Sequence, residues 1–179
     1  MKNLAIFLAV ITTQVYAQSN IDNLFLKKVN QFRAQNGKTT VIYDDALDSA
    51  AHWHSRWMKQ YQQLSHSEHF YHTTQQRIEK YDMTAFIYNR YDKYLVKENI
   101  IKVGYYSNSF TADSLVDRVF TAWLNSPPHR EAILADWATN IGFGEILTVT
   151  IDPTFPIKHN QVWATLVITT TNKQIRVTE

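Results

Sequence analysis

The spacing of the apolar residues changes along this chain, and that change limits the folds open to it. Before about residue 134, apolar residues recur three and four positions apart, which is the spacing of an amphipathic helix. From Ile141 onward, large apolar residues alternate with small or polar ones, which is typical of strands. Helices followed by antiparallel strands predict an α+β layered domain.

The expected elements can be placed from their ends. Long helices are predicted over 20–36, 44–61 and 114–125, with a short helix over His129–Leu134. Ser114 with Asp117 resembles a capping box, and Pro127 with Pro128 would end the third helix. Strands are predicted over 141–150 and 162–168, and Val41–Tyr43 is short and extended.

Residues 67–97 have no clean period, because tyrosines and charged residues are mixed there. Thr73 or Thr74 could cap a short helix over Gln75–Tyr81, and the remainder is predicted as loop. Aromatic residues gather in this part of the chain. Most are expected in the core, and a fraction could line a groove for an apolar or glycan ligand.

The first residues resemble a secretory signal. A basic start at Lys2 precedes an apolar run over Leu4–Val15, and small residues lead to a predicted cleavage after Ala17. A membrane anchor is the alternative, but the run is shorter than the roughly 20 residues of a bilayer span. Residues 18–179 are therefore expected to form one exported domain, secreted or periplasmic, with no later membrane span.

The chain contains no cysteine, which excludes disulfides and a lipoprotein anchor. Packing alone must then hold the fold, and an exported protein of this kind fits a bacterial source better than a eukaryotic one. The formal net charge is +2, and basic and acidic residues are interspersed. So weak a charge does not indicate a nucleic acid partner.

Several short segments resemble known signatures when they are taken in order. They are Val29–Arg33 with Asn36–Gly37, Tyr43–Ala51, Leu64–Ser67, Glu98–Ile100, Ala122–Arg130 and Asn140–Gly144. Together they resemble the CAP superfamily, the cysteine-rich secretory, antigen 5 and pathogenesis-related 1 group, in its bacterial SCP-like extracellular form. The resemblance covers nearly all of residues 18–179.

The resemblance implies a three-layer α-β-α sandwich with a central antiparallel sheet and a cleft lined by histidines and glutamates. The matching positions are His66, Glu98 and His129, with Asn99 beside Glu98. A second glutamate in many eukaryotic members corresponds here to Ser126. In members of this family a glycine commonly precedes the glutamate and the second histidine. In this sequence Lys97 precedes Glu98, and Pro128 precedes His129.

Two imidazoles and a carboxylate could hold Zn²⁺ or another divalent metal, with a fourth position for water. The alternative is a buried hydrogen-bond network that joins the sheet to its helices. Two other metal or catalytic interpretations carry less weight. His66, His69 and His72 form a loop cluster without the spacing of a zinc protease, and nearby serines lack a nucleophile-elbow motif.

His54 lies on the apolar face of a predicted helix, where a histidine is more often a hydrogen-bonded core residue than a ligand. His52, two residues away, cannot face one ligand together with it.

Two functions follow from these features. The first is an exported binding or interaction module whose cleft takes a small apolar molecule, a peptide or a cell-envelope component. The second is a metal-dependent, peptidase-like hydrolase that uses His66, Glu98 and His129. The absent second carboxylate favours the first, and fold by itself does not decide whether the protein is an enzyme.

Overall fold

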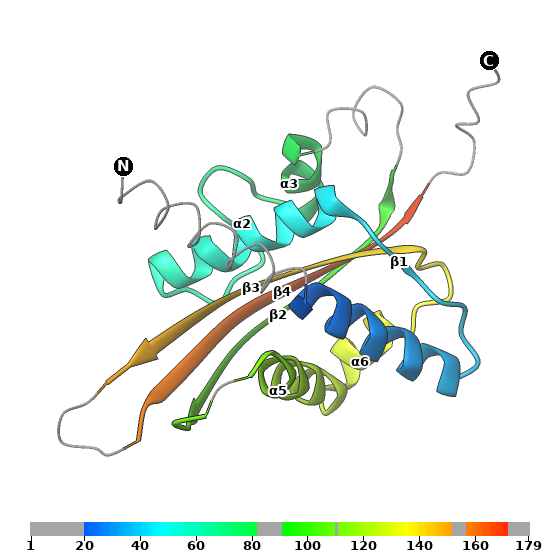
Figure 1. Cartoon of the computed structure of the whole chain (residues 1–179). Helices are drawn as coiled ribbons and strands as arrows, with labels where there is room; N and C mark the ends of the chain where they lie inside the picture. The colour runs from blue at the N-terminus through cyan, green and yellow to red at the C-terminus, as the bar shows by residue number, and fades with distance from the viewer. Residues whose placement is uncertain (1–19, 82–90, 110, 152–156, 172–179) are drawn as a thin grey trace, which may run out of the picture.

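A computed structural model describes residues 20–81, 91–109, 111–151 and 157–171 (Figure 1). The predicted signal peptide, residues 1–17, lies outside the described residues. Within them, no helix combines the length and the apolar character that a membrane crossing requires.

A four-stranded sheet forms the middle of the molecule, in the order β1-β3-β4-β2. Its strands are β1 (Ile42–Tyr43), β2 (Tyr91–Tyr106), β3 (Asn140–Thr150) and β4 (His159–Thr171). β3 and β2 pair antiparallel with β4, and the two residues of β1 pair in parallel with β3. The two predicted C-terminal strands are thus confirmed as the antiparallel pair β3–β4.

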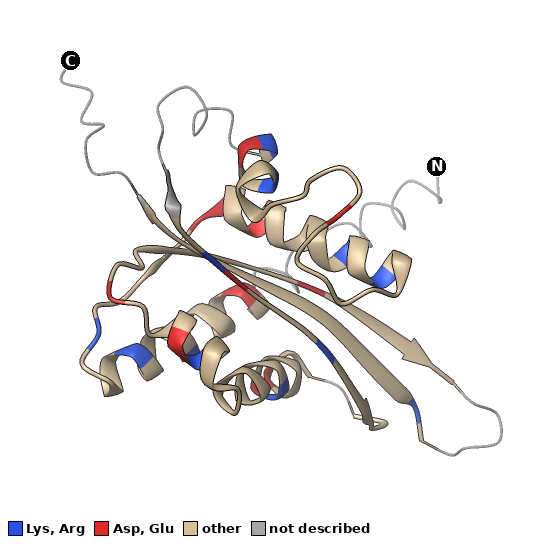
Figure 2. Cartoon of the chain, turned by 180° about the vertical axis from the view of Figure 1, so that it is seen from behind, with Lys and Arg blue, Asp and Glu red and all other residues tan. Residues whose placement is uncertain are grey.

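Helices cover both faces of the sheet (Figure 1). On one face lie α2 (Asp45–Tyr61) and α3 (Thr74–Tyr81). On the other lie the N-terminal helix (residues 20–35), α5 (Ala112–Leu124) and α6 (Pro127–Ile133). The three-layer α-β-α sandwich is therefore confirmed. Basic and acidic positions are scattered over both helical layers (Figure 2).

The central strand β4 supplies the core on both sides of the sheet. Its alternate residues Val162, Ala164, Leu166 and Ile168 pack with Phe25, Trp123 and Phe143 between the sheet and the second helical layer. Trp163 and Val167 face α2 and pack against Met58 and Leu47 respectively. Because both faces are covered, the middle of β4 is buried throughout.

The close fit of α2 on the sheet has a local cause in two glycines of β3. A Cβ added at Gly142 would lie 2.1 Å from the backbone nitrogen of Asp48, and one at Gly144 would lie 2.1 Å from that of His52. The α2 backbone therefore rests directly on the β3 backbone. Asp44 starts this helix by accepting hydrogen bonds from the backbone nitrogens of Ala46 and Leu47.

One part of the predicted order of elements is wrong. Residues 91–97, predicted as loop, belong to β2, so a long strand lies between α3 and α5. Polar residues such as Lys97 and Glu98 obscured it, because pairing with β4 rather than an apolar period defines this strand.

The ends of two helices also differ from the prediction. Thr111, not Ser114, is the N-cap of α5, and Ser114 completes the capping box three residues later. Pro127 and Pro128 open α6 instead of only ending α5, because proline at the first helical positions loses no helical hydrogen bond.

Candidate functional site

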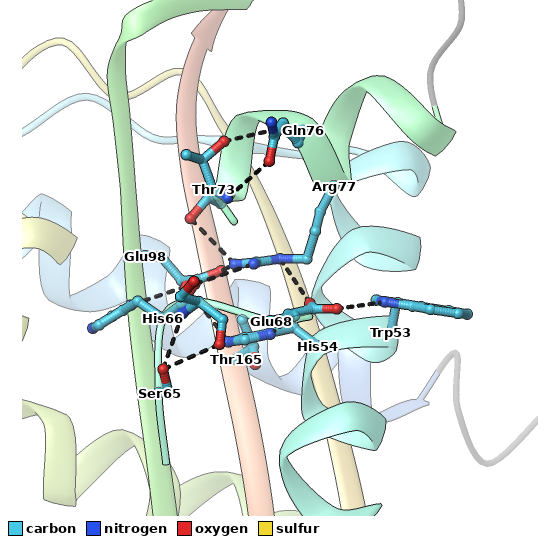
Figure 3. A network of polar contacts seen from close by, with 12 residues as sticks. Trp53, His54, Ser65, His66, Glu68, Thr73, Gln76, Arg77, Glu98 and Thr165 are labelled. Atoms are coloured by element: carbon cyan, nitrogen blue, oxygen red, sulfur yellow. Dashed lines mark hydrogen bonds and ion pairs between the residues drawn. The ribbon is translucent and has the colours of Figure 1, made fainter. Parts of the chain in front are cut away.

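A buried arginine joins two buried glutamates between α3 and the sheet (Figure 3). Arg77 of α3 forms an ion pair with Glu98 of β2 through Nη2, and its Nε lies 3.4 Å from Oε1 of Glu68. The side chains of Arg77 and Glu68 are fully buried and that of Glu98 is nearly so. Buried charges are tolerated only when they are paired in this way.

Two residues of α2 complete the surroundings of Glu68. His54 donates from Nδ1 to Oε1 of Glu68 at 2.8 Å, and Trp53 donates from Nε1 to Oε2 at 2.8 Å. The Nε2 of His54 lies 3.7 Å from Oε1 of Glu98. His54 is thus a hydrogen-bonded core histidine, as the sequence predicts, and Glu68 ties its loop to α2.

His66 lies at the exposed edge of this cluster (Figure 3). Its Nδ1 donates to Oε1 of Glu98 at 2.9 Å, and its backbone oxygen accepts from Nη1 of Arg77 at 3.2 Å. The His66 side chain is 60% exposed while that of Glu98 is 3% exposed. One end of the cluster therefore reaches solvent through a single imidazole.

The electrostatics keep Glu98 ionised. Burial by itself raises the pKa of Glu98, but the hydrogen bond from His66 and the charge of Arg77 outweigh it, so the pKa lies below the ordinary value. With Glu68 nearby, the cluster contains two carboxylates for one guanidinium. His54, His66 and Trp53 supply further donors to these carboxylates.

His129 reaches the same region from α6. Asn99, next to Glu98 on β2, donates from Nδ2 to the backbone oxygen of His129 at 2.9 Å. Burial, and then the charge of nearby His66, lower the pKa of His129. Its Nδ1 is buried and has no hydrogen-bond partner within the described residues. Ser126, the N-cap of α6, makes no capping hydrogen bond with its side chain.

The structure thus joins most of the residues that the sequence singles out. His66 and Glu98 touch, and Asn99 links Glu98's strand to His129. The sequence analysis did not predict that Arg77 and Glu68 belong to this cluster. Glu68 stands two residues after His66, which is a weak signal, and nothing in the polar sequence of α3 marks Arg77 as buried.

The donor set does not suit a metal ion bound by His66, Glu98 and His129. Both carboxylate oxygens of Glu98 are already engaged, one by His66 and one by Arg77. In the described ranges of the chain, no three His, Cys, Asp or Glu side chains are grouped to hold a metal. A cation bound to Glu98 would have to share a carboxylate oxygen with Arg77 or with His66.

The other histidines have separate environments. His52 lies 3.2 Å from Oδ1 of Asp48 and 3.6 Å from Oε2 of Glu145. The ring of His69 packs against Trp57 and Tyr61, at centroid distances of 5.9 and 5.2 Å. As the sequence predicts, His52 and His54 contact different residues.

A groove of about 650 Å³ is lined in part by residues of α6, the helix that carries His129, but His129 itself is not among its lining residues. Its lining includes Lys97, which precedes Glu98, and Pro127 and Arg130, which flank His129. Trp137 and Leu134 add apolar surface, and Lys97 lies 3.6 Å from Oε1 of Glu131 across the same groove. The groove mixes apolar surface with charge of both signs.

The α-β-α sandwich brings His66, from the loop after α2, against Glu98 of the edge strand β2. Residues 26–145 match the sequence model of the CAP family, described as the cysteine-rich secretory protein family. The match spans more than half of the chain, so the chain belongs to this family. Among curated proteins, no relative is found.

Solved bacterial structures show the same fold. An outer surface protein of Borrelia burgdorferi has 21% identity and a TM-score of 0.55, over 84% of this chain and 92% of that one. An extracellular SCP-domain protein of Bacillus anthracis strain Ames has 19% identity and a TM-score of 0.55, over 81% of this chain and 40% of that one.

Proposed function

We propose that this chain is an exported binding module of the CAP family and not a metal-dependent enzyme. The observation that carries the proposal is the engagement of Glu98, whose two oxygens are held by Arg77 and His66. A carboxylate with a lowered pKa is a weak proton acceptor at neutral pH. Because both of its oxygens already have partners, it is also a poor candidate for a metal ligand.

The ligand site in this proposal is the surface around His66 and His129, with the groove beside it. The lowered pKa of His129 keeps its imidazole neutral near pH 7, so the ring can serve as a hydrogen-bond partner. Pro127 and Trp137 provide apolar surface in the groove, and Arg130 provides a donor for acidic groups. These features suit a peptide or envelope component better than a purely apolar molecule.

Two observations support export. The first residues have the order of a cleavable secretory signal. The names of the two similar structures describe an outer surface protein and an extracellular protein. We infer a secreted or periplasmic location for residues 18–179.

The alternative function is a hydrolase in which His66, Glu98 and His129 hold a zinc ion that would supply an activated water. The Nδ1 of His129, which has no partner within the described residues, favours it. The buried ion pair of Glu98 with Arg77 argues against it.

Zinc titration calorimetry on residues 18–179 distinguishes the two functions. We expect no saturable zinc binding that depends on both His66 and His129. His66→Ala and His129→Ala are the test variants, and His72→Ala, which alters an exposed histidine of the same loop region, is the matched control. Binding of one zinc per chain, lost in both variants and accompanied by chelator-sensitive hydrolysis of peptides or esters, would overturn the proposal.

A second experiment tests binding directly. The purified protein is incubated with an envelope extract, and retained molecules are identified by mass spectrometry. We expect a peptide or envelope component to be retained by the parent protein and lost in His129→Ala. If the parent protein retains no molecule in greater amount than His129→Ala does, the binding proposal is contradicted.

A further inference from the structure

The exposed side of α2 carries a groove lined by aromatic rings, away from His129. Its volume is about 250 Å³, and it is lined by Trp53, Arg56, Trp57, Gln60, Tyr61 and Phe70. The aromatic residues of the helix stand four positions apart, which places them on one face. A second hollow of about 240 Å³ shares Trp57 and continues along Ser67 and His69.

Two aromatic residues of this groove are open to solvent. Phe70 is 73% exposed and Tyr61 is 44% exposed. Exposed large rings that border a hollow mark a binding surface more often than scattered single residues do. Tyr61 also packs on Trp57, with ring centroids 5.3 Å apart.

The two tryptophans are held rigidly from behind by the buried cluster. Trp53 donates to Glu68, and the ammonium of Lys80 lies 3.4 Å from the centroid of the Trp53 ring. The Trp57 ring stacks nearly parallel to His54, at 7° and 5.8 Å, and His54 is itself bound to Glu68. Trp57 is only 5% exposed and forms the floor of the groove, whereas Trp53 is half-buried. Because Trp53 is fixed before a ligand arrives, stacking on it costs little ordering entropy.

The polar groups of the groove define what could stack there. Arg56 and Gln60 are exposed at its rim. Within the described part of the chain, no acidic side chain pairs with Arg56, and the Nε1 of Trp57 is buried without an acceptor. Glu68, which lines the second hollow, is fully buried and bound to Trp53, His54 and Arg77.

We propose that this groove binds a carboxylated glycan, with sugar rings stacked on the aromatic side chains and a carboxylate at Arg56. A sugar presents apolar C–H faces and polar edges, which match rings bordered by donors. The site is separate from the surface around His66 and His129, so it adds to the proposed function and can fail independently of it.

The test is a titration of residues 18–179 with a hyaluronan hexasaccharide, which carries glucuronate, and with neutral chitohexaose, followed by tryptophan fluorescence and calorimetry. We expect hyaluronan to bind more tightly than chitohexaose. Phe70→Ala should weaken binding of both by about tenfold, as loss of one stacked ring does. Arg56→Gln should lower the affinity for hyaluronan to that for chitohexaose.

Matched controls distinguish this groove from the surface around His66 and His129. Leu64→Ala alters a residue of the same loop that is 54% exposed but outside the groove, and it should bind as the parent does. His66→Ala and His129→Ala should also bind both glycans normally, and a loss in either would place the glycan elsewhere and overturn the proposal.

Three further results would overturn it. These are no binding of either glycan at millimolar concentration, binding unchanged in both Phe70→Ala and Arg56→Gln, or saturation of the groove by a fatty acid but by neither glycan.

Discussion

Replacing Gly144 by alanine should destabilise the fold strongly, because α2 lies directly on β3 at this residue. The new Cβ would lie 2.1 Å from the backbone nitrogen of His52 and 2.4 Å from the carbonyl carbon of Ala51. Ordinary van der Waals contact begins at 3.4 Å. The helix and strand would have to separate by about 1.3 Å, the difference between 3.4 and 2.1 Å, because neither backbone can turn away.

That separation also disturbs hydrogen bonds at the same contact. Ser55 of α2 donates to the backbone oxygen of Gly144 at 2.7 Å and lies 2.8 Å from Oγ1 of Thr165 in β4. Overpacking costs about 1–3 kcal/mol, and each hydrogen bond contributes about 0.5–1.5 kcal/mol. The free energy of unfolding should therefore fall by about 2–6 kcal/mol, out of roughly 5–15 kcal/mol for a typical domain.

Urea unfolding at pH 7, followed by tryptophan fluorescence and circular dichroism, measures this loss. Gly104→Ala in β2 is the control, because its Cβ would meet only the end of the His159 side chain, at 3.1 Å. The control should change the free energy of unfolding by less than about 1 kcal/mol. A Gly144→Ala protein within about 0.5 kcal/mol of the parent would refute the close packing of α2 on β3 as a source of stability.

Three further predictions concern the buried cluster. Arg77→Met should lower the free energy of unfolding by about 3–5 kcal/mol at pH 7, because two buried carboxylates lose their cation. Urea unfolding measures this loss, with Arg130→Met, which alters an exposed arginine, as the control. Equal stability of the two variants would contradict the prediction. Because the pKa of Glu98 is lowered in the folded protein, ionised Glu98 stabilises the fold above pH 4.5, its ordinary pKa. This stabilisation is lost as the pH falls through the lower pKa of the folded state. The free energy of unfolding should therefore fall less steeply with acid in Glu98→Gln. By NMR titration, the pKa of His129 should lie below 6.5 and rise in His66→Ala, and no change in that variant would argue against their proximity.

The elements that depend on residues close together in sequence were predictable. The aspartate cap and apolar stripe of α2, the glycine after the first helix and the alternation in β3 and β4 are local patterns, and the structure has an element at each. The resemblance to the CAP family also identified His66, Glu98 and His129, which no local spacing would have connected.

The parts that depend on distant partners were not predictable in the same way. β2 is a strand because β4 pairs with it along its length, although its own sequence carries Lys97, Glu98 and Lys102. Thr111 became the helix cap in place of Ser114 because the backbone turn, not the residue type, selects the cap.

The amino-acid sequence was sufficient to establish the fold class, the absence of disulfides and the positions of the candidate histidines. The folded chain was needed to show that Arg77 holds Glu98, and that Glu68 anchors Trp53 and His54. This division arises because an amphipathic pattern is a property of one segment. Burying a charge requires a partner, and that partner comes from an element that reaches it only in the folded chain.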